Sequence, residues 1–232
     1  MRPPRCLALL ALLPAAAHAD QILYHSDFEN GVIDPQWGHS ARLDQGPVFT
    51  TFMGRYAGST QNNLNNSVSL SLPAVPPGDT GNGGAGGGSG GGGSPYSILN
   101  FDFYCIDSWD GNSTTLGPDL FEVYINGADL FSYTFSNNPN YGQSYPNLPT
   151  IGPSYLAFGQ DLDSIYRNIT IPFTVDTATD IVIKWRSNGL QAMSDESWGI
   201  DNVTVTYTAV PTPGAVALLG LSGLTLARRR RR

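Results

Sequence analysis

The chain has 232 residues, of which 41% are hydrophobic and only 13% are charged, so it holds enough apolar material for a globular core. Between positions 20 and 209, five basic residues stand against 19 acidic ones, a formal charge of −14 that argues against nucleic acid as a partner. The whole chain has two cysteines and three histidines, which disfavours a zinc or other transition-metal cluster.

The first 19 residues predict a secretory signal peptide. Two arginines precede the apolar stretch CLALLALLPAAA, which is followed by the small-residue cleavage pattern Ala-His-Ala. We therefore expect export of the protein and cleavage before Asp20. Removal of this segment would leave Cys105 as the lone cysteine, and its apolar surroundings predict a small buried residue on a strand rather than a nucleophile.

Period-2 patterns and turn residues predict an all-β fold. Val68, Leu70 and Leu72 alternate with serines and should share the buried face of one strand. The stretch LFEVYINGADLFSYTFS predicts two strands around the hairpin turn at Asn126-Gly127. Further strands are predicted at YSILNFDFYCID, NITIPFTV, TDIVIKWRS and IDNVTVTYT. Together these strands predict an antiparallel β-sandwich of jelly-roll type over residues 20–209.

A glycine-rich segment interrupts this pattern at residues 76–95. It contains eleven of the 27 glycines and has no side chains suited to a core, so its composition predicts a flexible coil. Such a coil is either a linker between two domains or a long loop within one domain. Because residues 20–75 are few for an independent core, we expect the loop.

Acidic residues gather in the stretches HSDFENG, CIDSWDGNSTTLGPDLFE and MSDESWGIDN. In many jelly-roll domains, acids of the first and last strands meet at one edge around a Ca²⁺ ion, and Asp27, Glu29 and Asp201 have the right places in the sequence for such a site. These oxygen ligands are therefore candidates for a structural Ca²⁺ site. The open alternative is that the acids lie in turns and accept hydrogen bonds from their own backbone.

The pattern acid-Ser-Trp occurs twice, around Trp109 and around Trp198. Trp198 leads directly into a strand and is expected in the core. Trp109 lies in a polar loop and is expected to be more open. With Asp107, Asp110 and Asp119 it forms a candidate ligand-binding group, in which the ring would stack on a sugar of an extracellular polysaccharide.

No persuasive catalytic set is visible in the sequence. The motif GGGSG lacks the strand-turn-helix context of a serine hydrolase, and a glycosidase needs two placed carboxylates, for which Asp110, Asp119 and Glu122 are the best candidates. We therefore expect a non-catalytic structural or carbohydrate-binding protein. The alternatives to this function are a secreted polysaccharide-active hydrolase and an adhesive protein-interaction module.

The tyrosine- and proline-rich stretch NPNYGQSYPNLPTIGPSY is expected to be a surface loop that either forms a binding rim or is plain coil.

Residues 210–232, VPTPGAVALLGLSGLTLARRRRR, combine a proline pair, an apolar run and five arginines. The apolar run of roughly 18 residues reaches the short limit of a membrane-spanning helix, and the basic end would stay on the cytoplasmic side. This order resembles the PEP-CTERM sorting signal of Gram-negative bacteria, although threonine replaces the usual glutamate between the prolines. The residues that carry the resemblance are Pro211, Thr212, Pro213, Arg228, Arg229 and Arg230.

The resemblance implies a hydrophobic C-terminal helix that holds the protein transiently at the inner membrane. It further implies cleavage near Pro211 by an exosortase-like enzyme and delivery to the cell surface or extracellular matrix. The stretches FDFYCIDSWDGNSTTLGPDLFEVYINGADLFSYTFS and NGLQAMSDESWGIDNVTV also resemble a secreted β-sandwich type found among PEP-CTERM proteins. That second resemblance implies a fold and a setting but no reaction.

Overall fold

The computed structural model describes residues 20–58, 66–75, 96–159, 161–174 and 179–208. These residues form strands and loops without a helix, so no described helix is long and apolar enough to cross a membrane. The predicted signal peptide, the glycine-rich segment and the predicted C-terminal helix lie outside the described residues. The strands are β1 (Asp20–Ser26), β2 (Leu43–Asp44), β3 (Phe52–Tyr56), β4 (Ser67–Leu72), β5 (Tyr96–Asp107), β6 (Leu120–Ile125), β7 (Ala128–Thr134), β8 (Ile151–Ser154), β9 (Asp163–Thr174), β10 (Ile181–Asn188) and β11 (Glu196–Thr208).

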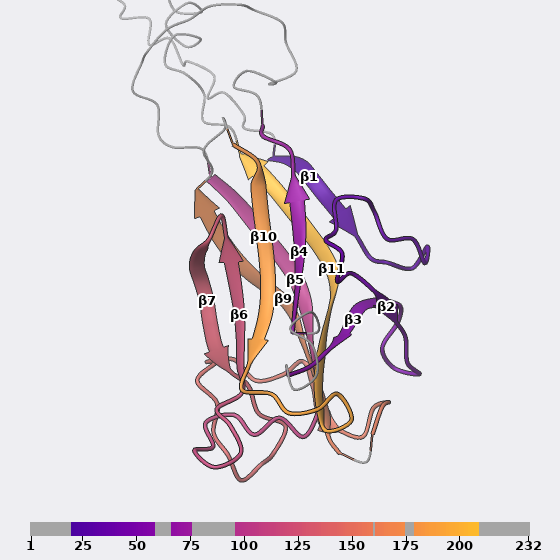
Figure 1. Ribbon diagram of the computed structural model, residues 1–232, viewed down its shortest axis with the longest axis vertical. Helices are drawn as coiled ribbons and strands as arrows, with labels where there is room; N and C mark the ends of the chain where they lie inside the picture. The colour runs from indigo at the N-terminus through magenta and orange to yellow at the C-terminus, as the bar shows by residue number, and fades with distance from the viewer. Residues whose placement is uncertain (1–19, 59–65, 76–95, 160, 175–178, 209–232) are drawn as a thin grey trace, which may run out of the picture.

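The strands form two antiparallel sheets that face one another (Figure 1). The larger sheet has the order β2-β3-β11-β5-β9-β8, and β1 pairs with the second half of β11 beyond β3. The smaller sheet has the order β4-β10-β6-β7. Strands from before and after the glycine-rich segment share both sheets, since β4 pairs with β10 and β3 pairs with β11. The described residues therefore form one β-sandwich-like unit.

Two sequence features fix the smaller sheet. Val68, Leu70 and Leu72 are all buried, which confirms the predicted alternation in β4. The hairpin between β6 and β7 turns at Asn126-Gly127, where φ is 48° and 83°, respectively. Both residues adopt the left-handed backbone conformation that the two-residue turn of a type I′ hairpin requires. Asn-Gly is the residue pair that adopts this conformation most readily.

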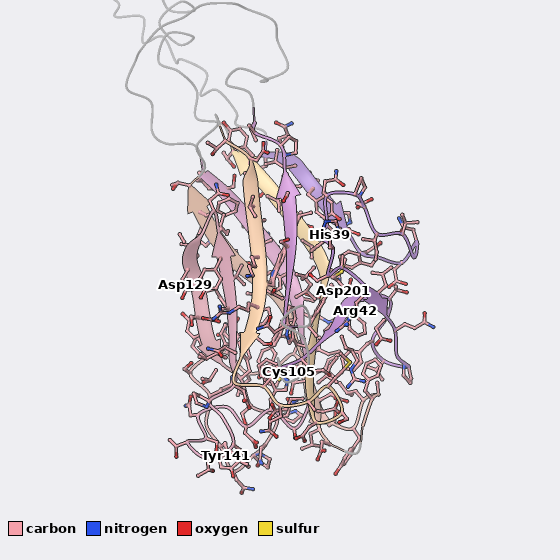
Figure 2. All side chains as sticks on the ribbon, in the orientation of Figure 1. His39, Arg42, Cys105, Asp129, Tyr141 and Asp201 are labelled. Carbon is pink, nitrogen blue, oxygen red and sulfur yellow. The ribbon has the colours of Figure 1, made fainter. Side chains whose placement is uncertain are left out.

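Aromatic side chains from both sheets fill the space between them. Phe103 of β5 stacks on Phe121 of β6 with ring centroids 4.1 Å apart, and Phe121 also meets the ring of Trp198 on β11 at 5.1 Å. Trp185 of β10 is fully buried in the same core. Cys105 is buried here too, as expected of a small apolar residue, and Figure 2 labels it within the ribbon. Burial of these large rings is the main stabilising contribution to the two-sheet fold.

The larger sheet carries bulges on both sides of Asp102, a 97% buried residue of β5. On β9 the register shifts next to Asn168, and on β11 it shifts next to Asn202, and both asparagines have positive φ. The Asp102 carboxylate accepts hydrogen bonds from Arg167 Nη1 (2.9 Å), Asn168 N (2.8 Å) and Asn202 Nδ2 (3.0 Å). One buried acid thus supplies the acceptors for donors that the two bulges release from the ladder.

Candidate functional site

Four loops converge at the lower end of the sandwich in Figure 1, and we call this the loop end. They connect β5 to β6, β7 to β8, β8 to β9, and β10 to β11. Backbone contacts tie them together: Asn112 N donates to Gly142 O (2.7 Å) and Ser108 N donates to Asp195 O (3.0 Å). The loop end contains most of the acids that the sequence singled out, and Figure 2 labels Tyr141 at its tip.

The two acid-Ser-Trp patterns meet at the loop end. In the β5–β11 ladder, Glu196 is opposite Asp107, and Trp109 Nε1 donates to Ser197 O (2.8 Å). Trp198 is fully buried, as predicted. The expectation that Trp109 would be more open is wrong, because this side chain is also fully buried and packs against Phe103 and Phe135. A buried ring offers no face to a sugar, so Trp109 helps to build the loop end instead.

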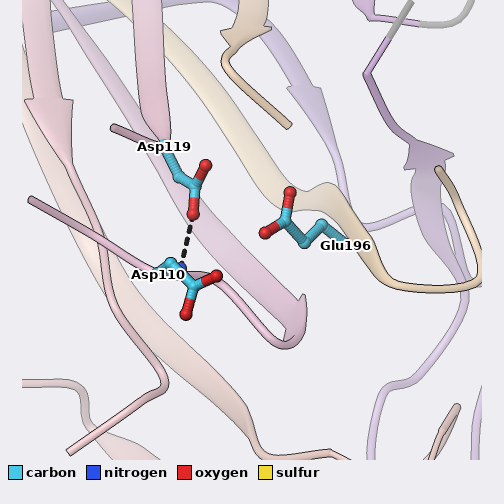
Figure 3. Close-up of side chains that lie close together, drawn as sticks. All are labelled: Asp110, Asp119 and Glu196. Atoms are coloured by element: carbon cyan, nitrogen blue, oxygen red, sulfur yellow. Dashed lines mark hydrogen bonds between the residues drawn. The ribbon is translucent and has the colours of Figure 1, made fainter. Parts of the chain in front are cut away.

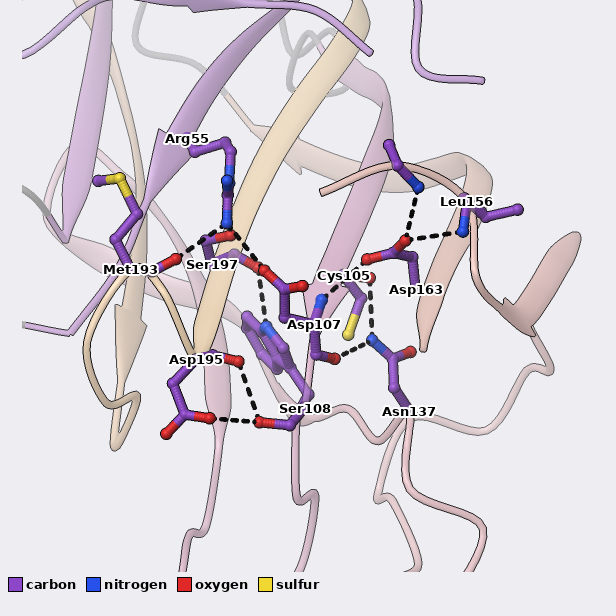
Figure 4. Close-up of polar contacts among 12 residues, drawn as sticks. Arg55, Cys105, Asp107, Ser108, Asn137, Leu156, Asp163, Met193, Asp195 and Ser197 are labelled. Carbon is purple, nitrogen blue, oxygen red and sulfur yellow. Dashed lines mark hydrogen bonds and ion pairs between the residues drawn. The ribbon is translucent and has the colours of Figure 1, made fainter. Parts of the chain in front are cut away.

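Asp107, a second member of the candidate ligand-binding group, lies in an internal polar network (Figure 4). Arg55 forms an ion pair with it through Nη2 and Oδ2 at 2.8 Å, and Asp107 N donates to Asp163 Oδ1 at 2.9 Å. Asn137 Nδ2 bridges the carbonyl oxygens of Cys105 (3.0 Å) and Asp107 (2.7 Å). Burial raises the pKa of Asp107 to about 6 although Arg55 acts in the opposite direction. These contacts assign Asp107 to the framework of the loops.

Asp110 and Asp119 do come together, and Glu196 joins them (Figure 3). One ligand atom from each of the three carboxylates lies within 4.8 Å of the others, and we call this group the carboxylate triad. Asp119 and Glu196 are fully buried, and Asp110 is 5% exposed. Within the described ranges it is the one group of His, Cys, Asp or Glu with this spacing. Its ligand atoms are all oxygens, which suits a hard cation such as Ca²⁺.

The loops hold the triad through a glycine directly after Asp110. Gly111 has φ of 57°, and a Cβ on it would lie 2.3 Å from Gly142 O in the β7–β8 loop. Only glycine permits this approach without displacement of the neighbouring backbone. The sequence indicated Asp110 and Asp119 but not Glu196 as a member of this group. The repeated acid-Ser-Trp pattern was the available signal, since it pairs the two stretches across β5 and β11.

Burial of the triad raises the pKa values of its carboxyl groups. The pKa of Asp119 rises to about 6 and that of Glu196 to about 8, and desolvation is the largest cause for both. Neighbouring carboxylates add to the rise in the pKa of Glu196, because like charges disfavour ionisation, whereas a side-chain hydrogen bond with Glu196 lowers the pKa of Asp119. The pKa of Asp110 rises as well, again chiefly through burial. Near neutral pH the group therefore holds a proton more readily than ordinary carboxylates do.

The expected Ca²⁺ set of Asp27, Glu29 and Asp201 is not assembled into a close group of ligand atoms among the described residues. Asp27 is exposed after β1, where its Oδ1 accepts from Glu29 N (3.2 Å), and Glu29 is exposed too. Asp201 is buried on β11, where its carboxylate accepts hydrogen bonds from Tyr104 Oη (2.7 Å) and Thr50 Oγ1 (3.1 Å). The contact of Asp27 matches the alternative in which an acid accepts a hydrogen bond from its own backbone, whereas Asp201 lies on a strand and accepts from side chains of other segments.

Glu122, the remaining candidate of the hydrolase alternative, lies apart from the triad on β6. It forms an ion pair with Arg186, with Nη2 and Oε2 2.8 Å apart, and accepts a hydrogen bond from Tyr124 Oη (2.9 Å). Of the three carboxylates proposed for hydrolysis, the structure therefore brings together only Asp110 and Asp119.

Comparisons with known proteins show no family for this chain and a distant structural likeness. No protein-family model matches it, and no curated protein is significantly similar in sequence. The crystal structure of dimeric latent PorU from Porphyromonas gingivalis is similar with 14% sequence identity and a TM-score of 0.41. The match covers 83% of this chain but 13% of the PorU chain, so the chain spans a small part of that protein's length. At this score the likeness supports no conclusion about function.

Proposed function

We propose that the chain is an exported, non-catalytic β-sandwich protein of jelly-roll type that is sorted to the cell surface or extracellular matrix. In this proposal it serves there as a structural or carbohydrate-binding protein. The export and sorting steps rest on residues 1–19 and 210–232, whose patterns match a signal peptide and a PEP-CTERM-like signal. An exosortase-like enzyme would be its processing partner, and its association with the membrane would be transient.

The observation that carries the binding role is a set of exposed apolar and aromatic side chains at the loop end, which we call the rim. Leu148 is 87% exposed, Tyr155 is 75% exposed and Leu116 is 50% exposed, and each comes from a different loop. Large side chains held open on otherwise well-packed loops are typical of interaction surfaces. A tyrosine ring adds a flat face for stacking and a hydroxyl for hydrogen bonding, both of which suit a sugar.

The arrangement of acids favours this proposal over the hydrolase alternative. Glycosidases keep their two carboxyl groups roughly 5–9.5 Å apart in a cleft that admits substrate. In the carboxylate triad the ligand atoms lie within 4.8 Å of one another, and Asp119 and Glu196 are closed to solvent. Catalysis by Asp110 and Asp119 would require the loops to open, whereas binding at the rim does not.

The binding role is tested by retention of the mature protein on a panel of extracellular polysaccharides. We expect retention that Tyr155→Ala and Leu148→Ala weaken at least severalfold. The matched controls are Tyr96→Ala and Leu130→Ala, which remove 43% exposed side chains at the other end of the sandwich. Equal losses from rim and control variants would contradict a role for the rim. Retention on purified surface proteins but on no glycan would favour the adhesive alternative.

The sorting steps are tested by mass spectrometry of the native protein from culture fractions. We expect an N-terminus at Asp20 and a C-terminus near Pro211 in the surface or matrix fraction. Substitution of Pro211 and Pro213 by alanine should trap the protein in the inner membrane with its arginines retained. A wild-type protein that stays in the inner membrane with an intact C-terminus would rule out sorting.

A further inference from the structure

The carboxylate triad joins parts of the chain that are far apart in sequence. Asp110 belongs to the loop after β5, Asp119 directly precedes β6, and Glu196 opens β11. The triad therefore lies where the two sheets approach the loop end. In Figure 3 the Asp119 and Glu196 carboxylates turn toward one another, with Asp110 beside them. Only Asp110 retains exposure to solvent, so access to the group is on its side.

The hydrogen bonds of the triad leave two buried oxygen atoms without a donor. Asp119 Oδ2 accepts from Asp110 N, and Glu196 Oε2 accepts from Gln191 N at 2.6 Å. Asp110 Oδ1 has a long contact of 3.4 Å with Asn138 Nδ2. Asp119 Oδ1 and Glu196 Oε1 are closed to solvent and meet no N–H or hydroxyl donor in the described part of the chain, and a hydrogen bond between these two carboxyl groups needs a proton on one of them. A buried carboxylate oxygen without a donor is costly, so this pair of atoms requires a proton or a cation.

The arginine ion pairs of the described residues are made elsewhere. Arg55 is paired with Asp107, Arg167 with Asp102 and Arg186 with Glu122. The groups that act on Glu196 electrostatically are instead acidic, namely Asp119, Asp195 and Asp110, and the buried Cys105 thiol is also close enough to interact. Among the described residues, the electrostatic neighbours of Glu196 thus add negative charge to the triad rather than compensate it.

We propose that Asp110, Asp119 and Glu196 bind one divalent cation of the Ca²⁺ class and thereby fasten the β5–β6 loop to the start of β11. Each of the three carboxylates offers one oxygen atom within 4.8 Å of the others, and an all-oxygen ligand set is what Ca²⁺ prefers. Mg²⁺ fits less well, because it keeps several water molecules and two of the three side chains are closed to solvent. The inference is independent of carbohydrate binding, since the rim contributes none of the three residues.

The test is calorimetric titration of Ca²⁺ and, separately, Mg²⁺ into the mature protein after treatment with a chelator and dialysis. We expect one Ca²⁺ per chain, weaker binding of Mg²⁺, and an affinity for Ca²⁺ that rises between pH 5.5 and pH 8 as protons leave the triad. At a Ca²⁺ concentration about a hundred times the Kd, the Tm should rise by roughly 5–10 °C.

Two isosteric variants link this response to the triad. Glu196→Gln and Asp119→Asn each remove a buried charge and should weaken Ca²⁺ binding at least tenfold. In chelator at pH 8 their Tm should equal or exceed that of the parent, because a costly charge has been removed. Glu122→Gln is the matched control. It alters another buried acid, which is paired with Arg186, and should lower the Tm while the Ca²⁺ response remains.

Two outcomes would overturn the inference. If neither cation binds nor changes the Tm at pH 8, the Asp119 and Glu196 carboxyls share a proton and hold no metal. If Ca²⁺ binds but both triad variants respond like the parent, the site lies elsewhere. Neither outcome depends on a polysaccharide, so failure of this inference is distinguishable from failure of the proposed binding function.

Discussion

Two groups of buried acids differ in the donors that surround them. In the middle of the larger sheet, Asp102 accepts three hydrogen bonds from β9 and β11, and Asp201 accepts hydrogen bonds from Tyr104, Thr50 and its own neighbour Asn202. At the loop end, the carboxylate triad keeps two closed oxygen atoms without a donor. Burial is similar in both groups, so exposure alone does not separate the acids that support the sheet from the acids of the proposed ion site.

The difference follows from which hydrogen-bond donors the chain places around each acid. Bulges release backbone and side-chain donors in the middle of a sheet, and an acid at that position is saturated by them. At the loop end three acids approach one another, and each can only accept while ionised. The proposed ion site thus rests on a donor deficit among three close carboxylates, whereas the single oxygen of Asp107 that lacks a donor belongs to a carboxylate paired with Arg55.

The largest expected effect on stability comes from removing Asp102, whose carboxylate accepts three hydrogen bonds. Asp102→Ala should lower the free energy of unfolding by about 3 kcal/mol, because three donors lose a buried acceptor. Urea denaturation of the mature protein measures this loss. The control is Asp129→Ala, which removes an exposed acid of β7 and should change stability by less than about 0.5 kcal/mol. If the two variants were equally stable, the donors around Asp102 would not stabilise the fold.

The next effect is the pH dependence of the triad without divalent cations. Because the pKa of Glu196 rises from 4.5 to about 8 in the folded state, the folded protein holds a proton that the unfolded chain releases. This contribution to stability is fully present below about pH 4 and is lost as the pH rises through about 8. We expect a loss on the order of 2 kcal/mol between pH 5 and pH 8 in chelator.

The variant Glu196→Gln isolates this contribution, since Asp107 and Asp119, whose pKa values rise to about 6, titrate in the lower part of the same range. Denaturant midpoints of parent and variant should converge at pH 5 and diverge toward pH 8, where the variant is more stable. Parallel pH profiles for the two proteins would show that Glu196 does not hold the proton.

The sequence predicted the strands whose patterns are local. The alternation of Val68, Leu70 and Leu72 and the turn at Asn126-Gly127 are set by neighbours along the chain, and both are confirmed. The start of β9 was missed, because the bulge at Asn168 interrupts its alternation and the predicted strand began there. The strands β1, β2, β3 and β8 were not predicted either, because they are defined by their pairing partners rather than by an internal period.

The candidate site was predictable only in part for the same reason. Asp110 and Asp119 are nine residues apart, the sequence grouped them, and the structure brings their carboxylates together. Glu196 joins them through the register of β11 against β5; the repeated acid-Ser-Trp pattern marks both stretches but does not set that register. Trp109 looked open because its loop is polar, yet tertiary packing buries it against Phe103. Donor deficits and ring burial depend on contacts that are distant in sequence, so a single sequence cannot reveal them.

A smaller effect on stability is expected at Asp201, the second buried acid whose carboxylate accepts several hydrogen bonds. Tyr104→Phe removes the hydroxyl that donates to Asp201 Oδ2 and should cost about 1–2 kcal/mol in urea denaturation. Thr50 Oγ1 still donates to the same oxygen atom, which limits the loss. Tyr96→Phe is the control at an exposed position and should be neutral. A Tyr104 variant as stable as this control would mean that Asp201 needs fewer donors than Asp102.

The smallest effect is expected at Arg167, and it decides whether charge or donor number separates the two groups of acids. Its guanidinium meets Asp102 at 2.9 Å, but the side chain is 40% exposed, so solvent screens the pair. Arg167→Met should therefore cost less than about 1 kcal/mol, and less still at high salt. Asn168 N and Asn202 Nδ2 would continue to satisfy the carboxylate. If Arg167→Met instead cost as much as Asp102→Ala, the positive charge would be what stabilises a buried acid in this protein. The triad, which has no such ion pair among the described residues, would then depend even more on an external cation.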